Sequence, residues 1–155
     1  MKRLNEKLNV YLDNCCFNRP FDDQNFLKIR LETEAKLFVQ SLIRAGQVSL
    51  VWSYVLDYEN SANPCDERRL EIQRWKDLSA FQIEETPDVL EGMRDGIAKG
   101  LGPLDALHVA CAYEMDCDTF LTVDKGILKK AKCFSGIRII SPVNFVMEWE
   151  SEDVS

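Results

Sequence analysis

Short apolar runs alternate with longer stretches of helical periodicity along the chain. The apolar runs predict strands at 9–12, 48–52, 119–123 and 136–140, and residues 81–83 are expected to be a short extended piece. Apolar positions at helical spacing predict helices at about 25–45, 54–61, 66–78, 87–100, 103–115 and 125–132, and residues 142–149 are expected to form a last helix or turn. Apolar strands that alternate with helices are typical of parallel sheets covered on both sides. The pattern therefore predicts an α/β fold of three layers, α/β/α, around a mainly parallel sheet.

The helix expected from residue 103 differs from the others because an acid lies at the start of an otherwise apolar sequence. Gly102 is a suitable N-cap and Pro103 fits the first helical position, so Asp105 falls in the first turn. Apolar side chains follow nearly all round, which predicts a buried helix with Leu104 in its apolar stripe. Unpaired N–H groups at the helix start favour the Asp105 carboxylate, although acids are also ordinary in a first turn.

Three more acids are expected beside Asp105. Asp13 follows the first strand, Asp124 follows the strand at 119–123, and Glu59 lies on the helix after the second strand. Because sites in parallel sheets form beyond the carboxyl ends of the strands, all four acids are expected in one crevice. Two carboxylates about 4 Å apart repel by about 4 kcal/mol at an effective dielectric near 20. A divalent cation with oxygen ligands, Mg²⁺ with Mn²⁺ as the alternative, offsets that repulsion.

Each of these acids also has a simpler interpretation. Asp13 is suited to capping the loop after its strand, Asp124 to N-capping the helix that follows, and Glu59 to a solvated helix face. Asp57 competes with Glu59 for the site but is expected on a different side of the helix. His108, one turn beyond Asp105, is either a buried side chain that hydrogen-bonds an acid or loop, or a general acid or base.

The segment between the first strand and the long helix at 25–45 is rich in turn-forming residues, so residues 14–25 are predicted to be a loop. Phe26 and Leu31 are expected on the inward face of the long helix. Arg19 in this loop, and Lys125 after the last acid, are expected either to screen the acids or to contact phosphate groups.

Composition limits the class of protein. The 155 residues are 46% hydrophobic and 29% charged, which suits one domain at 1–150 followed by an acidic tail at 151–155. No apolar run approaches the roughly 20 residues of a membrane span, and no signal-peptide core develops, so a soluble cytoplasmic protein is expected. The six cysteines show no paired spacing and are expected to be free thiols. The net charge of −7 disfavours non-specific phosphate binding unless the acids bind cations.

Four segments, YLDNCCFNRP, SYVLDYENS, GPLDALHVACA and FLTVDKGIL, occur in this order. Their order resembles that of the PIN-domain nucleases, including the VapC-like toxins of toxin–antitoxin pairs, from about residue 9 to 145. The resemblance implies a parallel sheet with helices on both faces and metal-dependent cleavage of RNA phosphodiesters. It also implies a homodimer and a small antitoxin protein as partners. The metal-binding and catalytic acids implied by the resemblance are Asp13, Glu59, Asp105 and Asp124.

Supporting residues are implied in the same way. The Thr122 hydroxyl is expected to support Asp124, and His108 to lie close to the acids. Many family members have Ser or Thr after the first acid, whereas Asn14 stands there in this chain, so a supporting role of Asn14 is a departure from the family pattern.

Two other classes of function stay open at this point. A PIN-like fold with the same acids can serve as a non-catalytic interaction module, and its acidic surface fits that role. A phosphotransfer domain would use Asp13 as the phosphate acceptor, but it usually carries a second acid two residues further on, where this chain has Cys15. Metal-dependent turnover of RNA discriminates between the nuclease and the interaction module.

Overall fold

A five-stranded parallel sheet forms the centre of the protein. The computed structural model describes residues 7–154. The strand order is β3-β2-β1-β4-β5, and every neighbouring pair is parallel. The strands are β1 Leu8–Leu12, β2 Val48–Ser53, β3 Phe81–Ile83, β4 Thr119–Leu121 and β5 Arg138–Ile140. Parallel connections need crossovers, which the intervening helices supply.

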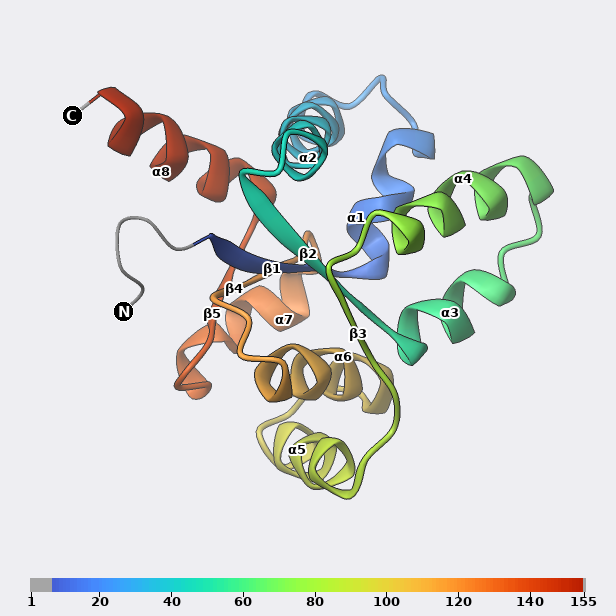
Figure 1. Ribbon diagram of the computed structural model, residues 1–155, viewed down its shortest axis with the longest axis vertical. Coiled ribbons are helices and arrows are strands. Elements are labelled where there is room, and N and C mark those ends of the chain that lie inside the picture. The colour runs from blue at the N-terminus through green and yellow to red at the C-terminus, as the bar shows by residue number, and fades with distance from the viewer. Residues whose placement is uncertain (1–6, 155) are drawn as a thin grey trace.

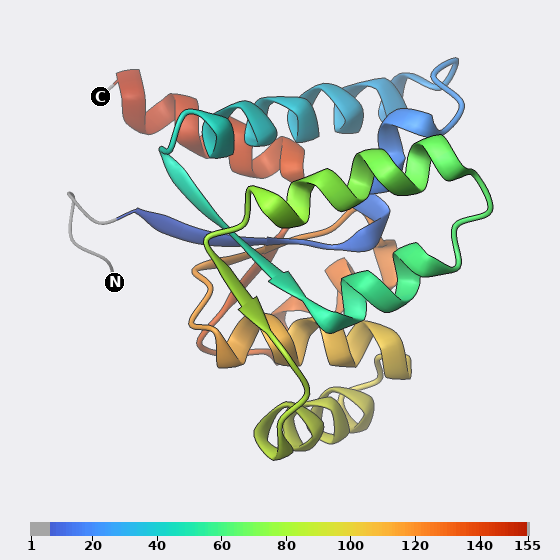
Figure 2. The ribbon, with the colours of Figure 1, turned by 45° about the vertical axis from the view of Figure 1, so that its right-hand side comes forward.

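Helices cover both faces of this sheet, as Figures 1 and 2 show. One layer contains α1 Asn14–Asn18, α2 Leu27–Arg44, α4 Asp66–Asp77 and α8 Pro142–Val154. The other contains α3 Tyr54–Ser61, α5 Pro87–Ala98, α6 Pro103–Glu114 and α7 Lys125–Lys129. The predicted α/β/α architecture is confirmed, and the sheet is parallel throughout.

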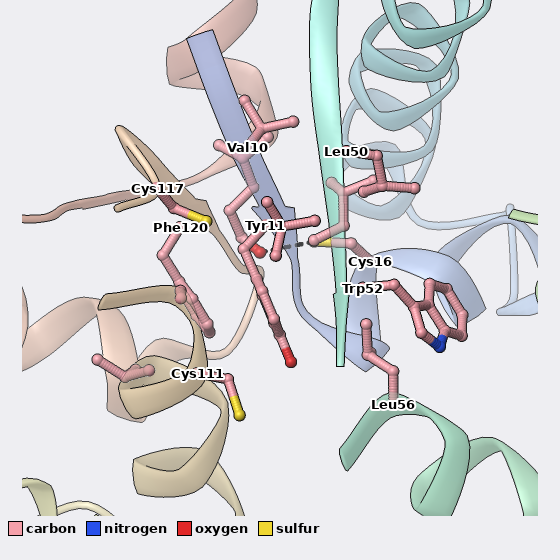
Figure 3. Packing of buried hydrophobic residues seen from close by; sticks show 14 of the residues in the cluster. Val10, Tyr11, Cys16, Leu50, Trp52, Leu56, Cys111, Cys117 and Phe120 are labelled. Atoms are coloured by element: carbon pink, nitrogen blue, oxygen red, sulfur yellow. Dashed lines mark hydrogen bonds between the residues drawn. The ribbon is translucent and has the colours of Figure 1, made fainter. Parts of the chain in front are cut away.

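The core lies on both sides of β1, the central strand. Val10, Tyr11 and Leu12 are fully buried. Figure 3 shows Tyr11 beside Phe120 of β4, and their rings stack with centroids 5.3 Å apart. Burial of the strand on both faces explains why its sequence is a near-continuous apolar run.

Close contact with α5 fixes the position of α6. Gly96 faces Ala106, and a Cβ placed on that glycine would lie 2.8 Å from the Ala106 Cβ. Gly92 and Ala110 meet in the same way one turn further along. Small residues therefore allow the two helices to approach closely. The start of α6 is as predicted, with Gly102 as N-cap and Pro103 in its first turn, but Leu104 points outward and is 42% exposed.

Two expectations about the first crossover were wrong. Residues 14–18 form α1 rather than loop, because the Asp13 carboxylate accepts the backbone N–H of Asn14 and caps a helix there. On α2, Phe26 and Leu31 are 61% and 52% exposed, whereas the polar side chains Glu32, Thr33, Lys36 and Gln40 are buried. The apolar spacing alone did not reveal that polar groups occupy the inward face.

The last helix continues beyond its expected end. α8 runs through Val154, so the acidic residues after Trp149 extend it as far as the structure describes them. Residues 1–6 and 155 lie outside the described residues, so the final residue of the expected tail, Ser155, is not described. None of the helices within 7–154 combines the length and apolar content that a membrane crossing requires.

Candidate metal-binding site

The four predicted acids come from the carboxyl edge of the sheet and the two helices beside it. Asp13 follows β1, and Asp124 lies two residues after the Thr122 that continues from β4. Glu59 lies on α3, and Asp105 in the first turn of α6. In Figure 1, α3 and the end of β1 that leads into α1 lie on the right-hand side of the sheet.

Asp13 is buried, with 4% of its surface exposed, and hydrogen bonds reach both of its carboxylate oxygens. Oδ1 accepts the backbone N–H of Asn14 at 2.8 Å. Oδ2 accepts the Thr122 hydroxyl at 2.8 Å and the Cys15 thiol at 3.3 Å. These donors hold the carboxylate in one orientation.

Thr122 connects the first acid to the last. Its hydroxyl donates to Asp13 and accepts the backbone N–H of Asp124 at 3.0 Å. The Thr122 hydroxyl thus contacts Asp124, as expected, at its backbone N–H, and it also contacts the Asp13 carboxylate. Asp124 itself N-caps α7, since its Oδ1 accepts the Ile127 N–H at 3.0 Å. Asp124 therefore caps α7 and also lies at the site.

Glu59 is held from two sides. His108 Nε2 contacts Glu59 Oε1 in a short hydrogen bond, and the Asn14 side-chain amide donates to Oε2 at 3.0 Å. Burial acts to raise the pKa of Glu59, but the hydrogen bond and charge interaction with His108, with the bond from Asn14, bring that pKa below its usual value. Asn14 therefore supports Glu59, although it departs from the family pattern.

Asp57 faces another part of the molecule, as its helical position predicts. Its two oxygens accept the Trp52 indole N–H and the Lys76 ammonium, each at 3.0 Å. This acid ties α3 to α4 and β2, and Glu59 is the acid of α3 that faces the site.

The charges of the other acids repel the Asp105 carboxylate. Burial, followed by the negative charges of Asp13 and Asp124, raises the pKa of its carboxyl to about 6. Glu59 adds to this repulsion and His108 partly offsets it. The four acids therefore lie close enough to interact, and their charges are incompletely compensated by the residues around them.

His108 is fully buried within α6. Its Nε2 also lies 3.9 Å from Asp13 Oδ1, and its Nδ1 is 2.6 Å from the Tyr11 hydroxyl. That hydroxyl is in turn 2.6 Å from Ser53 Oγ. A buried histidine that hydrogen-bonds an acid is thus the interpretation that the geometry favours over a solvent-accessible acid or base.

The donor set fits a hard divalent cation. All four acids offer oxygen ligands, which Mg²⁺ and Mn²⁺ prefer, and their mutual repulsion is the kind of cost that a cation removes. The Asn14 Oδ1 atom is buried and accepts no hydrogen bond from the described residues. Within residues 7–154, no three His, Cys, Asp or Glu side chains are already gathered around one point. The chemistry of the donors fits the ion, although their side chains do not converge on one point.

Arg19, which was expected either to screen the acids or to contact phosphate, pairs with other carboxylates instead. Arg19 pairs with Asp22 at 2.8 Å and lies 3.3 Å from Glu32. Lys125 is exposed directly after Asp124 and remains the better candidate for contact with a phosphate.

Sequence reasoning missed Tyr11 as a residue linked to the site and identified Ser53 only as a helix cap. Ser53 does cap α3, accepting the Leu56 N–H at 3.2 Å. A tyrosine inside a buried strand was the available signal, because a buried phenol needs a hydrogen-bond partner.

Comparisons with known proteins agree with the fold. FitAcB from Neisseria gonorrhoeae superposes with a TM-score of 0.54 at 15% identity, covering 86% of this chain and 97% of that one. VapBC2 from Rickettsia felis, bound to a DNA fragment from the promoter, gives 0.53 at 12% identity, with 85% and 97% covered. DNA-bound VapBC from Salmonella typhimurium gives 0.51 at 16% identity, with 87% and 98% covered.

Sequence comparison gives the family. No curated protein matches the chain. The family model described as PIN domain matches residues 10–132, a span that includes all four acids. The chain belongs to the PIN-domain family.

Proposed function

We propose that this protein is a divalent-metal-dependent endoribonuclease, the toxin component of a toxin–antitoxin pair. The observation that carries the proposal is the placement of Asp13, Glu59, Asp105 and Asp124 at one sheet edge, where burial and the charges of the other acids raise the pKa of Asp105 to about 6. PIN-domain family membership supports nuclease chemistry. Four carboxylates that repel one another destabilise the folded protein, and cation binding would offset that repulsion.

The residues have separate roles in this mechanism. Asp13 and Asp105 are assigned as the strongest ligands for Mg²⁺ or Mn²⁺, with Glu59 and Asp124 completing the set directly or through water. An ion held there would lower the pKa of a water nucleophile and neutralise charge on the scissile phosphate. Thr122 holds the Asp13 carboxylate in place through its hydroxyl. The exposed Lys125 is assigned to a phosphate oxygen of the RNA.

The proposal includes a protein partner. The solved structures that share the fold include VapBC assemblies bound to DNA. On this chain, Phe26, Leu27 and Leu31 at the start of α2 are each more than half exposed. Exposed apolar clusters are typical of protein interfaces, which supports both an antitoxin and a homodimer. Light scattering of the purified chain, alone and co-expressed with the product of the neighbouring gene, tests the two assemblies.

Cleavage of a mixed RNA pool tests the enzymatic part. Purified protein is incubated with Mg²⁺, Mn²⁺ or EDTA, and Asp105→Asn and Asp13→Asn are compared with wild type. We expect cleavage with either metal, none with EDTA, and a loss of at least about a thousandfold in both variants, since a metal site supplies several kcal/mol.

Asp88→Asn is the matched control for Asp105→Asn. Asp88 is also a first-turn acid next to an initial proline, but it lies at the start of α5. It should keep wild-type activity. Absence of cleavage by folded, metal-saturated wild type would reject the nuclease and favour the non-catalytic interaction module.

A further inference from the structure

We propose that Tyr11 and Ser53, acting through His108, are positioning residues that hold the Glu59 carboxylate in the orientation used by the active site. This inference rests on the proposed nuclease function. It concerns residues outside the four acids and gives the lone histidine a role other than proton transfer.

A continuous set of hydrogen bonds runs from β2 to the acid. Ser53 Oγ lies 2.6 Å from the Tyr11 hydroxyl, which lies 2.6 Å from His108 Nδ1. His108 Nε2 then contacts Glu59 Oε1. The three supporting side chains come from β2, β1 and α6, and the acid comes from α3, so the chain of bonds joins four elements.

The direction of the bond to Glu59 follows from the chemistry of the groups. A carboxylate only accepts, so His108 Nε2 carries a proton and donates to Glu59. On the other side of the ring, Nδ1 is hydrogen-bonded to the Tyr11 hydroxyl, and that hydroxyl to Ser53 Oγ. Ser53 Oγ in turn accepts the Leu56 N–H at the start of α3. Each group is satisfied, and the same serine caps the helix that carries Glu59.

Burial excludes a direct role for these groups in the reaction. Tyr11, Ser53 and His108 each have 0% of their surface exposed, whereas the Glu59 side chain is 23% exposed. Stacking on Phe120 fixes the Tyr11 ring, as Figure 3 shows. Only Glu59 reaches solvent, so the buried residues act through that carboxylate. Partners of this kind typically change activity by about 10- to 100-fold when removed.

The Asn14 amide provides the second point of support. It donates to Oε2 while His108 contacts Oε1, so each oxygen of Glu59 has its own partner. A carboxylate held at both oxygens loses rotational freedom before any ligand arrives. The set of bonds therefore prepares one orientation of Glu59.

Nitrogen-15 NMR of the histidine ring tests the geometry without relying on activity. His108 is the only histidine in the chain, so protein made without a histidine tag gives one pair of ring signals. We expect a proton on Nε2, the ring nitrogen that faces Glu59. Tyr11→Phe should shift the Nδ1 signal and Glu59→Gln the Nε2 signal. Tyr54 is the first residue of α3, and its phenol hydroxyl is bonded to Glu85. Tyr54→Phe removes that hydroxyl and should shift neither signal.

Steady-state cleavage tests the consequence for Glu59. We expect Tyr11→Phe to lower kcat about tenfold with KM within about twofold, and Tyr54→Phe to leave both unchanged. Wild-type kcat in a folded Tyr11→Phe protein, or ring signals that ignore both substitutions, would overturn the inference. Glu59→Gln decides the ring geometry even if Tyr11→Phe does not fold. If folded wild type cleaves no RNA, the nuclease proposal fails, whereas the NMR result still decides the hydrogen-bonded chain.

Discussion

The acids of the site are supported in two different ways. Asp13, which also caps α1, and Glu59 each receive hydrogen bonds at both carboxylate oxygens, and each takes at least one of them from a side chain far away in the sequence. Asp105 and Asp124 lie in or just before the first turn of α6 and α7, where a helix start favours negative charge. The first pair is therefore held by side-chain bonds, and Asp105 depends on the placement of its helix.

This difference indicates where the electrostatic cost of the site is located. Donors lower the pKa of Glu59, whereas burial and the surrounding acids raise that of Asp105 to about 6. One half of the site is thus prepared before metal binding, and Asp105 is the acid that gains most from a cation. Substitutions at the two halves should have different consequences.

Lys36→Met is expected to have the largest effect. It measures how much a charge buried away from the acids lowers the free energy of unfolding. Burial lowers the pKa of Lys36 from 10.5 to about 8. Between pH 8 and pH 10.5 the unfolded chain holds a proton on Lys36 that the folded chain lacks, so the free energy of unfolding rises with pH through this window. Below pH 8 the buried Lys36 is charged, and its full destabilising effect is present. Lys36→Met should add about 3 kcal/mol at pH 7 and flatten the pH dependence between 8 and 10.5.

Urea unfolding at several pH values measures this change. Lys28→Met, on the exposed side of the same α2 helix, is the control and should change stability by less than about 0.5 kcal/mol. Equal pH slopes for Lys36→Met and wild type would show that Lys36 keeps an ordinary pKa.

Gly96→Val should disturb Asp105 without touching the hydrogen bonds of Asp13. The added side chain meets Ala106 in the first turns of α6, so we expect a loss of about 2 kcal/mol in stability and reduced cleavage. Ala98→Val adds bulk on the exposed side of α5 and should cost far less. Unchanged stability of Gly96→Val would mean that the two helices can separate freely.

Thr122→Val breaks the support of Asp13 instead. It removes the hydroxyl that donates to Oδ2 and accepts the Asp124 N–H, so kcat should fall about tenfold. Thr119→Val, the same exchange earlier on β4, should retain activity. Full activity of Thr122→Val would show that the other donors suffice to orient Asp13.

Asp105→Asn should give the smallest effect, on the stability of the metal-free protein. Removing the charge that Asp13 and Asp124 repel should add about 1 kcal/mol after allowance for solvent screening, or about 3 °C in Tm. Added Mg²⁺ should raise the Tm of wild type and leave the variant unchanged. A lower Tm for metal-free Asp105→Asn would contradict the electrostatic comparison.

Much of this arrangement was predictable from the sequence, because local patterns determine it. The alternation of apolar runs and helices predicts the three layers, and Gly102 and Pro103 predict the start of α6. The acids at strand ends could be placed together once the sheet was taken as parallel. The prediction of the acids as catalytic and metal-binding residues remains a proposal.

Tertiary contacts determined what the sequence did not reveal. The bond between Tyr11 and His108 joins residues 97 positions apart, and no local pattern encodes it. The outward positions of Phe26 and Leu31 depend on how α2 lies over the sheet, which places Glu32 and Lys36 inside. Thr122 was expected beside Asp124, but the fold brings its hydroxyl to Asp13 as well.

Titration of the metal-free protein with Mn²⁺, followed by electron paramagnetic resonance, tests the central claim most directly. The claim is that the four acids form one cation site. We predict saturable binding by wild type at pH 7, and loss of that binding in folded Asp13→Asn and Asp105→Asn but not in Asp88→Asn. Absence of Mn²⁺ binding by folded wild type, or equal binding by all four proteins, would contradict it.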